Sequence, residues 1–143
     1  MIGDLEFAIK MAIECHEGVI DKSGVPYIFH PLRVMAGVQR MLPDDWEAQQ
    51  AAVLHDAKED YPQWWRIHGV LFSPRVQKLV DILSRDRDNE TYKDFINRVK
   101  NSDDDAAIVI KKADLYDNLT RPTPPELKGL KERYYKALEV LNR

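Results

Sequence analysis

The sequence has little of the residues that mark several common classes of protein. Cys15 is the only cysteine among 143 residues, so the chain can form neither an internal disulfide nor a cysteine zinc cage, and we expect a reducing, cytoplasmic setting. Six glycines and eight prolines are too few for a collagen-like or low-complexity chain. No uninterrupted apolar run approaches the ~18 residues of a membrane span, and the charged N-terminus is unlike a signal peptide. No membrane partner is therefore expected.

An excess of positive charge is also absent. The formal net charge is −3 at pH 7, so nothing favours binding to a nucleic-acid backbone, and no nucleic-acid partner is expected. Apolar residues make up 44% of the chain and charged residues 31%, which is the balance of a folded globular protein. The length suits one domain, and we expect residues 1–143 to form a single domain. The pattern indicates no oligomeric state.

Apolar residues recur with helical spacing along most of the chain, as Leu5, Ala8 and Ala12 do near its start, and they predict an all-α fold. Further helices are expected from about Pro31, over 46–60, over 63–71, after Ser73-Pro74, over 91–100, after 102–105, and from an opening at 123–126. Ile108, Val109 and Ile110 are β-branched, which makes a strand the alternative, but no second apolar run nearby offers it a partner. We therefore expect a compact, single-domain helical bundle of about seven to eight helices.

A burst of ionisable residues closes the helix expected over 46–60 and includes His55, Asp56, Glu59 and Asp60. Acids near a helix C-terminus face the negative end of the helix dipole, so a positive group such as a metal ion is expected to offset them. Residues three or four apart lie about 5–6 Å from one another on a helix. One turn could therefore bind a cation, while the next acts on a water beside it. The alternative is an ordinary solvated helix end.

Two residues elsewhere in the chain could join this cluster. His30 precedes a proline, and a lone histidine there is more often a capping or half-buried residue. Asp114 closes the most apolar segment, where a carboxylate needs either a cation or a lysine partner. With His55 and Asp56 they supply two imidazoles and two carboxylates, a set that suits Mn²⁺, Fe²⁺, Co²⁺ or Zn²⁺ and leaves coordination positions for water and substrate.

Other charged stretches are interpreted as solvated surface. They are the polar run 84–90 and the charged residues of the last helix, Lys128, Lys131, Glu132 and Arg133. The turn at 21–24 mixes a cation with hydroxyl and backbone donors, so it is either a phosphate contact or, more commonly, an exposed loop.

Four sequence blocks resemble the HD-domain metal phosphohydrolases. The closer similarity is to the hydrolase domain of RelA/SpoT-type alarmone enzymes, in particular the stand-alone small alarmone hydrolases. The blocks are KSGVPYIFHPL at 22–32, AAVLHDAKED at 51–60, VQKLV at 76–80 and IKKADLYDNL at 110–119. Their order and spacing both fit, and the resemblance covers roughly residues 5–120.

The resemblance implies a fold, a cofactor and a reaction. It implies a compact all-α HD-type fold and a single Mn²⁺, and in that family the 3′-pyrophosphate of the nucleotides ppGpp and pppGpp is removed to leave GDP or GTP. The implied metal ligands are His30, His55, Asp56 and Asp114; the implied catalytic pair that activates water is Glu59 and Asp60; the implied nucleotide-pocket residues are Lys22, Ser23, Tyr27 and Asn118. No synthetase domain follows, so this chain is expected only to degrade the alarmone.

The chain departs from the family pattern near the nucleotide base. Asp21 stands where an arginine that packs on the purine is usual, Thr120 stands where an arginine is frequent, and residues 61–65 replace a threonine-rich stretch. These changes leave the metal chemistry intact and the base open. The alternatives are an HD-type phosphohydrolase that acts on an adenosine alarmone, a deoxynucleotide or the phosphate of NADPH, and a non-catalytic module that binds metal and nucleotide.

Overall fold

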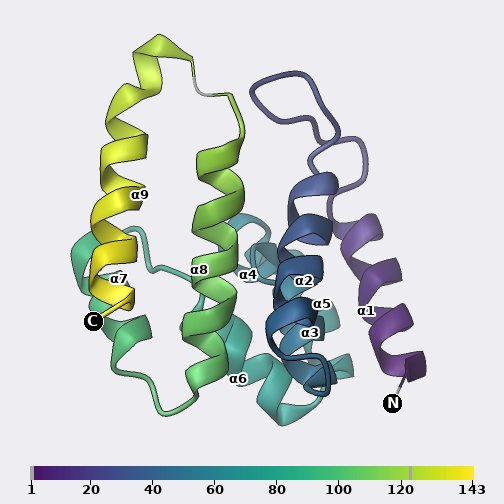
Figure 1. Ribbon diagram of the computed structural model, residues 1–143. Helices are drawn as coiled ribbons and strands as arrows, with labels where there is room; N and C mark the ends of the chain where they lie inside the picture. The colour runs from purple at the N-terminus through teal and green to yellow at the C-terminus, as the bar shows by residue number, and fades with distance from the viewer. Residues whose placement is uncertain (1, 123) are drawn as a thin grey trace.

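Helices account for the regular structure of the computed structural model, which describes residues 2–122 and 124–143 (Figure 1). The helices are α1 (Ile2–Cys15), α2 (Phe29–Met41), α3 (Trp46–Val53), α4 (Ala57–Asp60), α5 (Pro62–His68), α6 (Pro74–Ile82), α7 (Tyr92–Lys100), α8 (Asp105–Thr120) and α9 (Lys128–Leu141), with short 3₁₀ turns at Gly69–Leu71 and Pro125–Leu127. The expected all-α class is confirmed, and the β-branched run near 108–110 is helical. Thr123, the expected opening of the last helix, lies outside the described residues.

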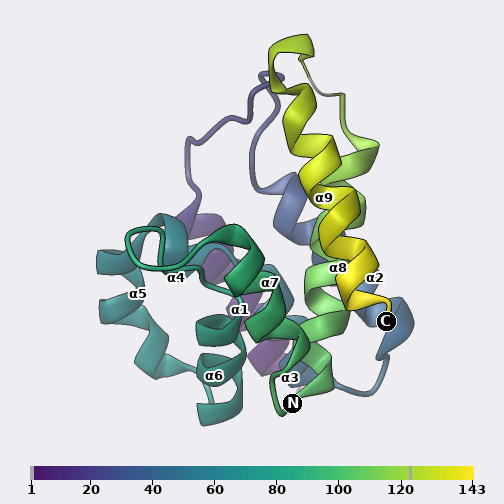
Figure 2. The ribbon, with the colours of Figure 1, turned by 90° about the vertical axis from the view of Figure 1, so that its left-hand side faces the viewer.

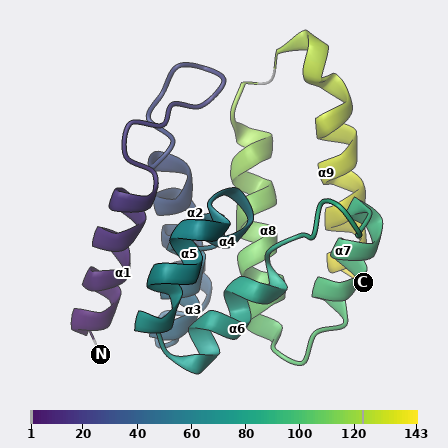
Figure 3. The ribbon, with the colours of Figure 1, turned by 180° about the vertical axis from the view of Figure 1, so that it is seen from behind.

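Helix α8 occupies the middle of the fold. It packs against α2 on one side and α9 on the other, and α3 packs against α1, α2 and α6. The side view shows α8 and α9 running together, with α4, α5 and α6 across the molecule from them (Figure 2). From behind, α4 lies in front of α2 and near the middle of the bundle (Figure 3). None of the described helices is long and apolar enough to cross a lipid bilayer.

One continuous apolar core joins these helices. Its largest fully buried side chains come from α2, α3, α6, α7, α8 and α9 and from the turn after α3; they are Val34, Val38, Val53, Leu54, Val76, Leu79, Val80, Phe95, Val99, Ile110, Leu115 and Leu141. Burying a side chain of this size stabilises a fold by roughly 1.5–3 kcal/mol relative to exposing it. The core therefore fixes α2, α3 and α8, which hold or adjoin the polar clusters singled out from the sequence.

An arginine ties together the starts of two of these helices. Asp45 caps α3 by accepting the Ala48 N–H, and Asp104 caps α8 by accepting the Ala106 N–H. Arg75 on α6 donates to both carboxylates, with Nη1 and Nη2 at 2.6 and 2.8 Å from Asp45 and Nε at 3.0 Å from Asp104. The paired guanidinium lowers the pKa of Asp45. Such forked charge-assisted bonds fix geometry as well as adding stability.

The expectation of one continuous helix over 46–60 is wrong. Helix α3 ends at Val53, a turn follows, and the single turn of α4 begins at Ala57. The carbonyl oxygen of Ala52 accepts from the backbone N–H of His55 and from ring Nδ1 at 2.7 Å, so it does not serve the Asp56 N–H as it would in a continuing helix. The break places His55 and Asp56 in the turn and puts Glu59 and Asp60 in α4.

Candidate metal centre

Three separate segments bring the four predicted ligands together. His30 lies in the first turn of α2, which begins at Phe29, two residues before the Pro31 near which a helix was expected. His55 and Asp56 follow α3, and Asp114 projects from α8. Ligand atoms of His30, His55 and Asp56 lie within 4.8 Å of one another. Oxygen Oδ1 of Asp114 lies 2.9 Å from Nε2 of His30 and 3.3 Å from Nε2 of His55.

The orientation of both imidazoles is fixed by a hydrogen bond at Nδ1, on the side of the ring that faces away from the centre. The His55 Nδ1–H donates to the Ala52 carbonyl, and the His30 Nδ1–H donates to Asp117 Oδ2 at 2.6 Å. Arg33 donates to the same carboxylate at 2.6 and 3.2 Å. Burial acts to raise the pKa of Asp117, but His30 and Arg33 hold it at about 2, so the carboxylate is an acceptor. Each histidine therefore directs Nε2 toward the centre, as metal-binding histidines do when an outer partner fixes the tautomer.

The centre has an excess of acceptors over donors, which fits a bound cation. His55 Nε2 is buried and has no hydrogen-bond partner within residues 2–122 and 124–143, and carboxylate oxygens of Asp56 and Asp114 face it at 3.1 and 3.3 Å. A lone pair and two carboxylates repel one another unless a positive charge lies between them. Burial alone would lower the pKa of His55, yet the two carboxylates raise it well above the ordinary value. Two imidazoles and two carboxylates suit a divalent transition metal ion.

Asp114 has the lysine partner that the sequence offered as the alternative to a metal cation. One oxygen faces the two imidazoles, while Oδ2 accepts from Lys111 Nζ at 2.7 Å. Burial acts to raise the pKa of Asp114, but Lys111 and His55 hold it well below its ordinary value. Asn118 Nδ2 donates to the same carboxylate at 3.3 Å. Asn118 is not the helix C-cap, because α8 continues to Thr120.

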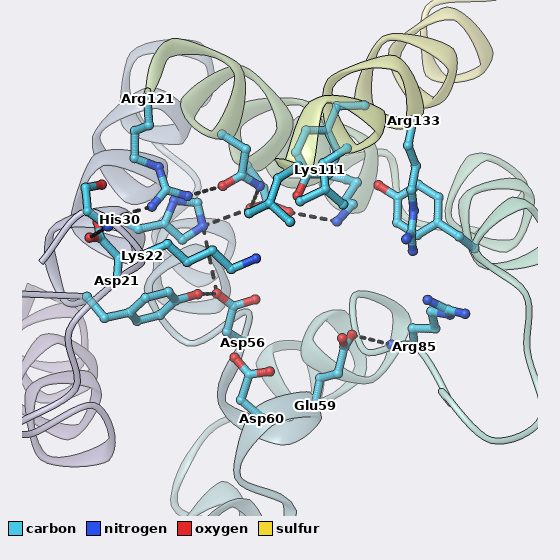
Figure 4. A pocket seen from close by; sticks show the side chains of 18 of the residues that line it. Asp21, Lys22, His30, Asp56, Glu59, Asp60, Arg85, Lys111, Arg121 and Arg133 are labelled. Atoms are coloured by element: carbon cyan, nitrogen blue, oxygen red, sulfur yellow. Dashed lines mark hydrogen bonds and ion pairs between the residues drawn. The ribbon is translucent and has the colours of Figure 1, made fainter. Parts of the chain in front are cut away.

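A pocket of about 610 Å³ opens beside the centre (Figure 4). All four residues that the resemblance places at a nucleotide pocket line it, namely Lys22, Ser23, Tyr27 and Asn118. Tyr27 also reaches the centre itself, because its hydroxyl donates to Asp56 Oδ2. Asp21 lies at this end of the pocket, where its Oδ1 accepts the backbone N–H groups of Ser23 and Val25, and Arg121 lies 3.6 Å from its Oδ2.

Glu59 and Asp60 also line the pocket, and an arginine bridges them. Arg87 donates to Glu59 Oε2 at 2.8 and 3.0 Å and to Asp60 Oδ1 at 2.9 Å. The backbone N–H of Arg85 donates to the other oxygen of Glu59. Burial, followed by the charge of Asp56, raises the pKa of Asp60 to about 6. Asp60 thus combines a position beside the centre with a pKa close to neutrality, which is what a proton acceptor needs.

Sequence reasoning missed several residues of this region. Asp117 carried a detectable signal, since it lies three residues after Asp114 on one helix face. Arg85 and Arg87 belong to the run interpreted as a solvated connection, and Arg133 to a charged face given no role. The structure contradicts the interpretation of Arg85 and Arg133 as solvated surface, because both are half-buried and line the pocket. Nothing in the local pattern shows where so long a side chain ends.

Comparisons with known proteins agree with the fold and with the sequence blocks. No family model matches the chain. The bifunctional (p)ppGpp synthase/hydrolase SpoT of Escherichia coli K12 is 38% identical over 81 residues, which are 57% of this chain and 11% of that protein. A probable GTP pyrophosphokinase of Mycobacterium leprae is 33% identical over 144 residues, covering 94% of this chain and 18% of that protein. A guanosine-3′,5′-bis(diphosphate) 3′-pyrophosphohydrolase of Aquifex aeolicus is 32% identical over 123 residues, covering 81% and 17%.

A solved structure shares the fold over almost the whole chain. It is described as a metazoan ortholog of SpoT that hydrolyzes ppGpp and plays a role in starvation responses, and it matches with a TM-score of 0.80 and 24% identity over 96% of this chain and 85% of that one. The fold and the site together define an all-α protein of the HD type. More particularly, it is a RelA/SpoT hydrolase-like protein, and the resemblance seen in the sequence is confirmed. The chain spans less than a fifth of the length of these curated relatives.

Proposed function

We propose that this protein is a metal-dependent hydrolase that removes the 3′-pyrophosphate of ppGpp-like nucleotides. The observation that carries the proposal is the convergence of His30, His55, Asp56 and Asp114 beside a pocket that also contains two carboxylates. The relatives named for ppGpp hydrolysis supply the substrate class. One apolar core runs through the helices, which supports the accompanying proposal that residues 1–143 act as one domain.

The proposed cofactor is a single Mn²⁺, held by those four residues. When bound, such an ion supplies Lewis-acid chemistry, because it polarises a phosphoryl oxygen and makes water acidic enough to attack near neutral pH. The residues of this chain prepare the site for it. Asp117 and the Ala52 carbonyl fix the two imidazoles, and Tyr27 holds the carboxylate of Asp56. Other divalent transition metal ions fit the same donor set.

Glu59 and Asp60 are the proposed catalytic pair. Both line the pocket close to Asp56, and Asp60 has a pKa of about 6, so at neutral pH it is ionised and able to accept a proton from the attacking water. Arg87 neutralises part of their charge in this structure, which lets two carboxylates and the centre coexist. Holding the proton acceptor close to the phosphorus atom that is attacked also increases the rate of hydrolysis.

Lys22, Ser23, Tyr27 and Asn118 are the proposed nucleotide contacts. They line one end of the pocket, where Lys22 provides positive charge for a phosphate and Asn118 provides amide groups beside Asp114. Asp21 occupies the position of the family arginine and pairs with Arg121, so the purine does not find the usual cation at that position. This difference is the specific observation that keeps another nucleotide as the second candidate substrate.

The proposal is tested by incubating the protein with Mn²⁺ and a panel of nucleotides. The panel contains ppGpp, its adenosine counterpart, a deoxynucleoside triphosphate and NADPH, and released pyrophosphate and phosphate are measured by ion chromatography. We expect pyrophosphate from ppGpp and none from an Asp56→Asn control. Turnover of a different nucleotide alone would retain the chemistry and change the substrate. Nucleotide binding without any product, unaffected by Glu59→Gln, would identify a non-catalytic binding module instead.

A further inference from the structure

The pocket has a second positively charged wall that the proposed chemistry does not use. Arg85 precedes α7, Tyr92 begins it, and Arg133 projects from α9, and all three line the pocket. We call these residues the distal wall. In the close-up view, Arg85 and Arg133 lie across the pocket from Lys22 and Arg121, with Glu59 and Asp56 between the two sides (Figure 4). A ligand at the metal centre therefore has cationic groups on both sides.

The two guanidinium groups of the distal wall lack acidic partners. Within residues 2–122 and 124–143, neither has a carboxylate oxygen within 4.0 Å, whereas Lys111 pairs with Asp114 and Arg87 with Glu59. Arg85 Nε donates only to the Glu90 carbonyl. Both arginines are half-buried. A cation withdrawn from water normally gains a counter-charge in return, and here the described part of the chain supplies none.

The hydrogen-bond donors of the distal wall are unmatched as well. The Arg133 guanidinium stacks over the Tyr92 ring, 3.7 Å from its centroid, which orients the planar group. Among the residues that the structure describes, neither its buried Nε–H nor the buried Tyr92 hydroxyl has a hydrogen-bond partner. Buried donors are nearly always satisfied, so two unmatched donors beside a cationic pair favour an acceptor that the described residues do not supply. An anion with several oxygens meets that requirement.

The distal wall is also fixed relative to the reacting groups. The backbone N–H of Arg85 donates to Glu59 Oε1 at 2.8 Å, which ties the segment to the proposed catalytic pair. Lys111, whose ammonium pairs with Asp114, lies 5.9 Å from the centroid of the Tyr92 ring. The wall therefore continues from the metal centre through Lys111 and does not form a separate surface patch.

We propose that Arg85, Tyr92 and Arg133 bind a second phosphate group of the substrate, other than the one that is attacked. This inference rests on the proposed function and deepens it, because it makes the protein selective for nucleotides with more than one phosphoryl group. That second phosphate is either the outer phosphate of the 3′-pyrophosphoryl group or the outer phosphate at the 5′ end, and the chemistry of recognition is the same.

The experiment uses Arg133→Gln and Arg85→Gln, with Arg66→Gln as the matched control. Arg66 is exposed on α5 and does not line the pocket. Dissociation constants are measured by calorimetry on the full chain with chelator present, so that nothing is turned over, and KM and kcat are measured with Mn²⁺. The ligands are ppGpp, the 3′-monophosphate ppGp and the 5′-monophosphate pGpp. Circular dichroism confirms that each variant is folded.

Loss of a charge-assisted contact to phosphate is expected to weaken ppGpp binding by about 10-fold or more in each variant. If the wall binds the outer 3′-phosphate, pGpp weakens equally and ppGp is unaffected; if it binds the 5′ end, ppGp weakens and pGpp is spared. Equal weakening of all three ligands, or no more weakening than in Arg66→Gln, overturns the proposal. If nucleotide binding depends on Arg133 but no nucleotide is hydrolysed, only the proposed function is contradicted. If hydrolysis is unaffected by the Arg133 substitution, only the proposed role of the distal wall is contradicted.

Discussion

Replacing Asp117 by asparagine tests whether the carboxylate behind His30 sets the affinity of the centre for metal. Asp117 accepts from His30 Nδ1 at 2.6 Å, and its side chain is 9% exposed, so this bond is shielded from water. Arg33 is 46% exposed and its share of the effect is small because solvent screens it. Asparagine keeps one acceptor oxygen for His30 and removes the negative charge.

The expected magnitude follows from that change. Loss of an outer carboxylate behind a metal-binding histidine lowers metal affinity by about 10- to 100-fold, equivalent to about 1.4–2.7 kcal/mol. Mn²⁺ affinity is measured by competition with a chelator of known strength, and thermal unfolding without metal is measured in parallel. Asp44→Asn is the control, because Asp44 is exposed and lies outside the pocket. Unchanged Mn²⁺ affinity in a folded Asp117→Asn protein would refute the orientation of His30 described above.

Three further outcomes are expected. Asp56→Asn should lose both metal and activity, since it removes a charged ligand, and full metal occupancy by elemental analysis would show that the ligand assignment is wrong. Glu59→Gln and Asp60→Asn should keep metal while hydrolysis falls by about 10²- to 10⁴-fold, and initial rates with ppGpp would contradict the pair's role if they stayed within a few-fold. Arg75 lowers the pKa of Asp45 in the folded state. The Arg75–Asp45 pair therefore stabilises the fold fully at pH values above the ordinary pKa of a carboxyl group, and this stabilisation is lost as the pH falls through the lowered pKa. Arg75→Met should remove about 1 kcal/mol at pH 7 and flatten this acid dependence in denaturant titrations, and an unchanged pH slope would argue against the clamp.

The sequence allowed two things to be predicted, the helical class and the meeting of four residues from three separate segments. Helical spacing and the lack of a pairing partner were enough to make 105–120 a helix despite its β-branched residues. His30, His55, Asp56 and Asp114 do meet, while the functional roles assigned to them stay predictions.

Two kinds of feature were beyond sequence reasoning. The end of α3 depends on a side-chain bond from His55 to Ala52, and helical periodicity carries no trace of such a bond. The distal wall depends on where Arg85 and Arg133 point after several rotatable bonds, and on what lies opposite them from other helices. The pattern of charged residues indicates the sign of the side chain's charge and the helix face that carries it. Tertiary packing decides whether that side chain lies in solvent or lines a pocket.

Helix α8 holds Lys111, Asp114, Asp117 and Asn118 at spacings of three and four residues, so they form one stripe along a single rigid element. Substitution within the stripe alters one contact at a time. Adding or deleting one residue upstream would instead turn the remainder of the stripe by about 100° around the axis and carry it away from both imidazoles. The number of residues in α8 that precede the stripe, more than their identity, is therefore the property that evolution and protein engineering must both preserve.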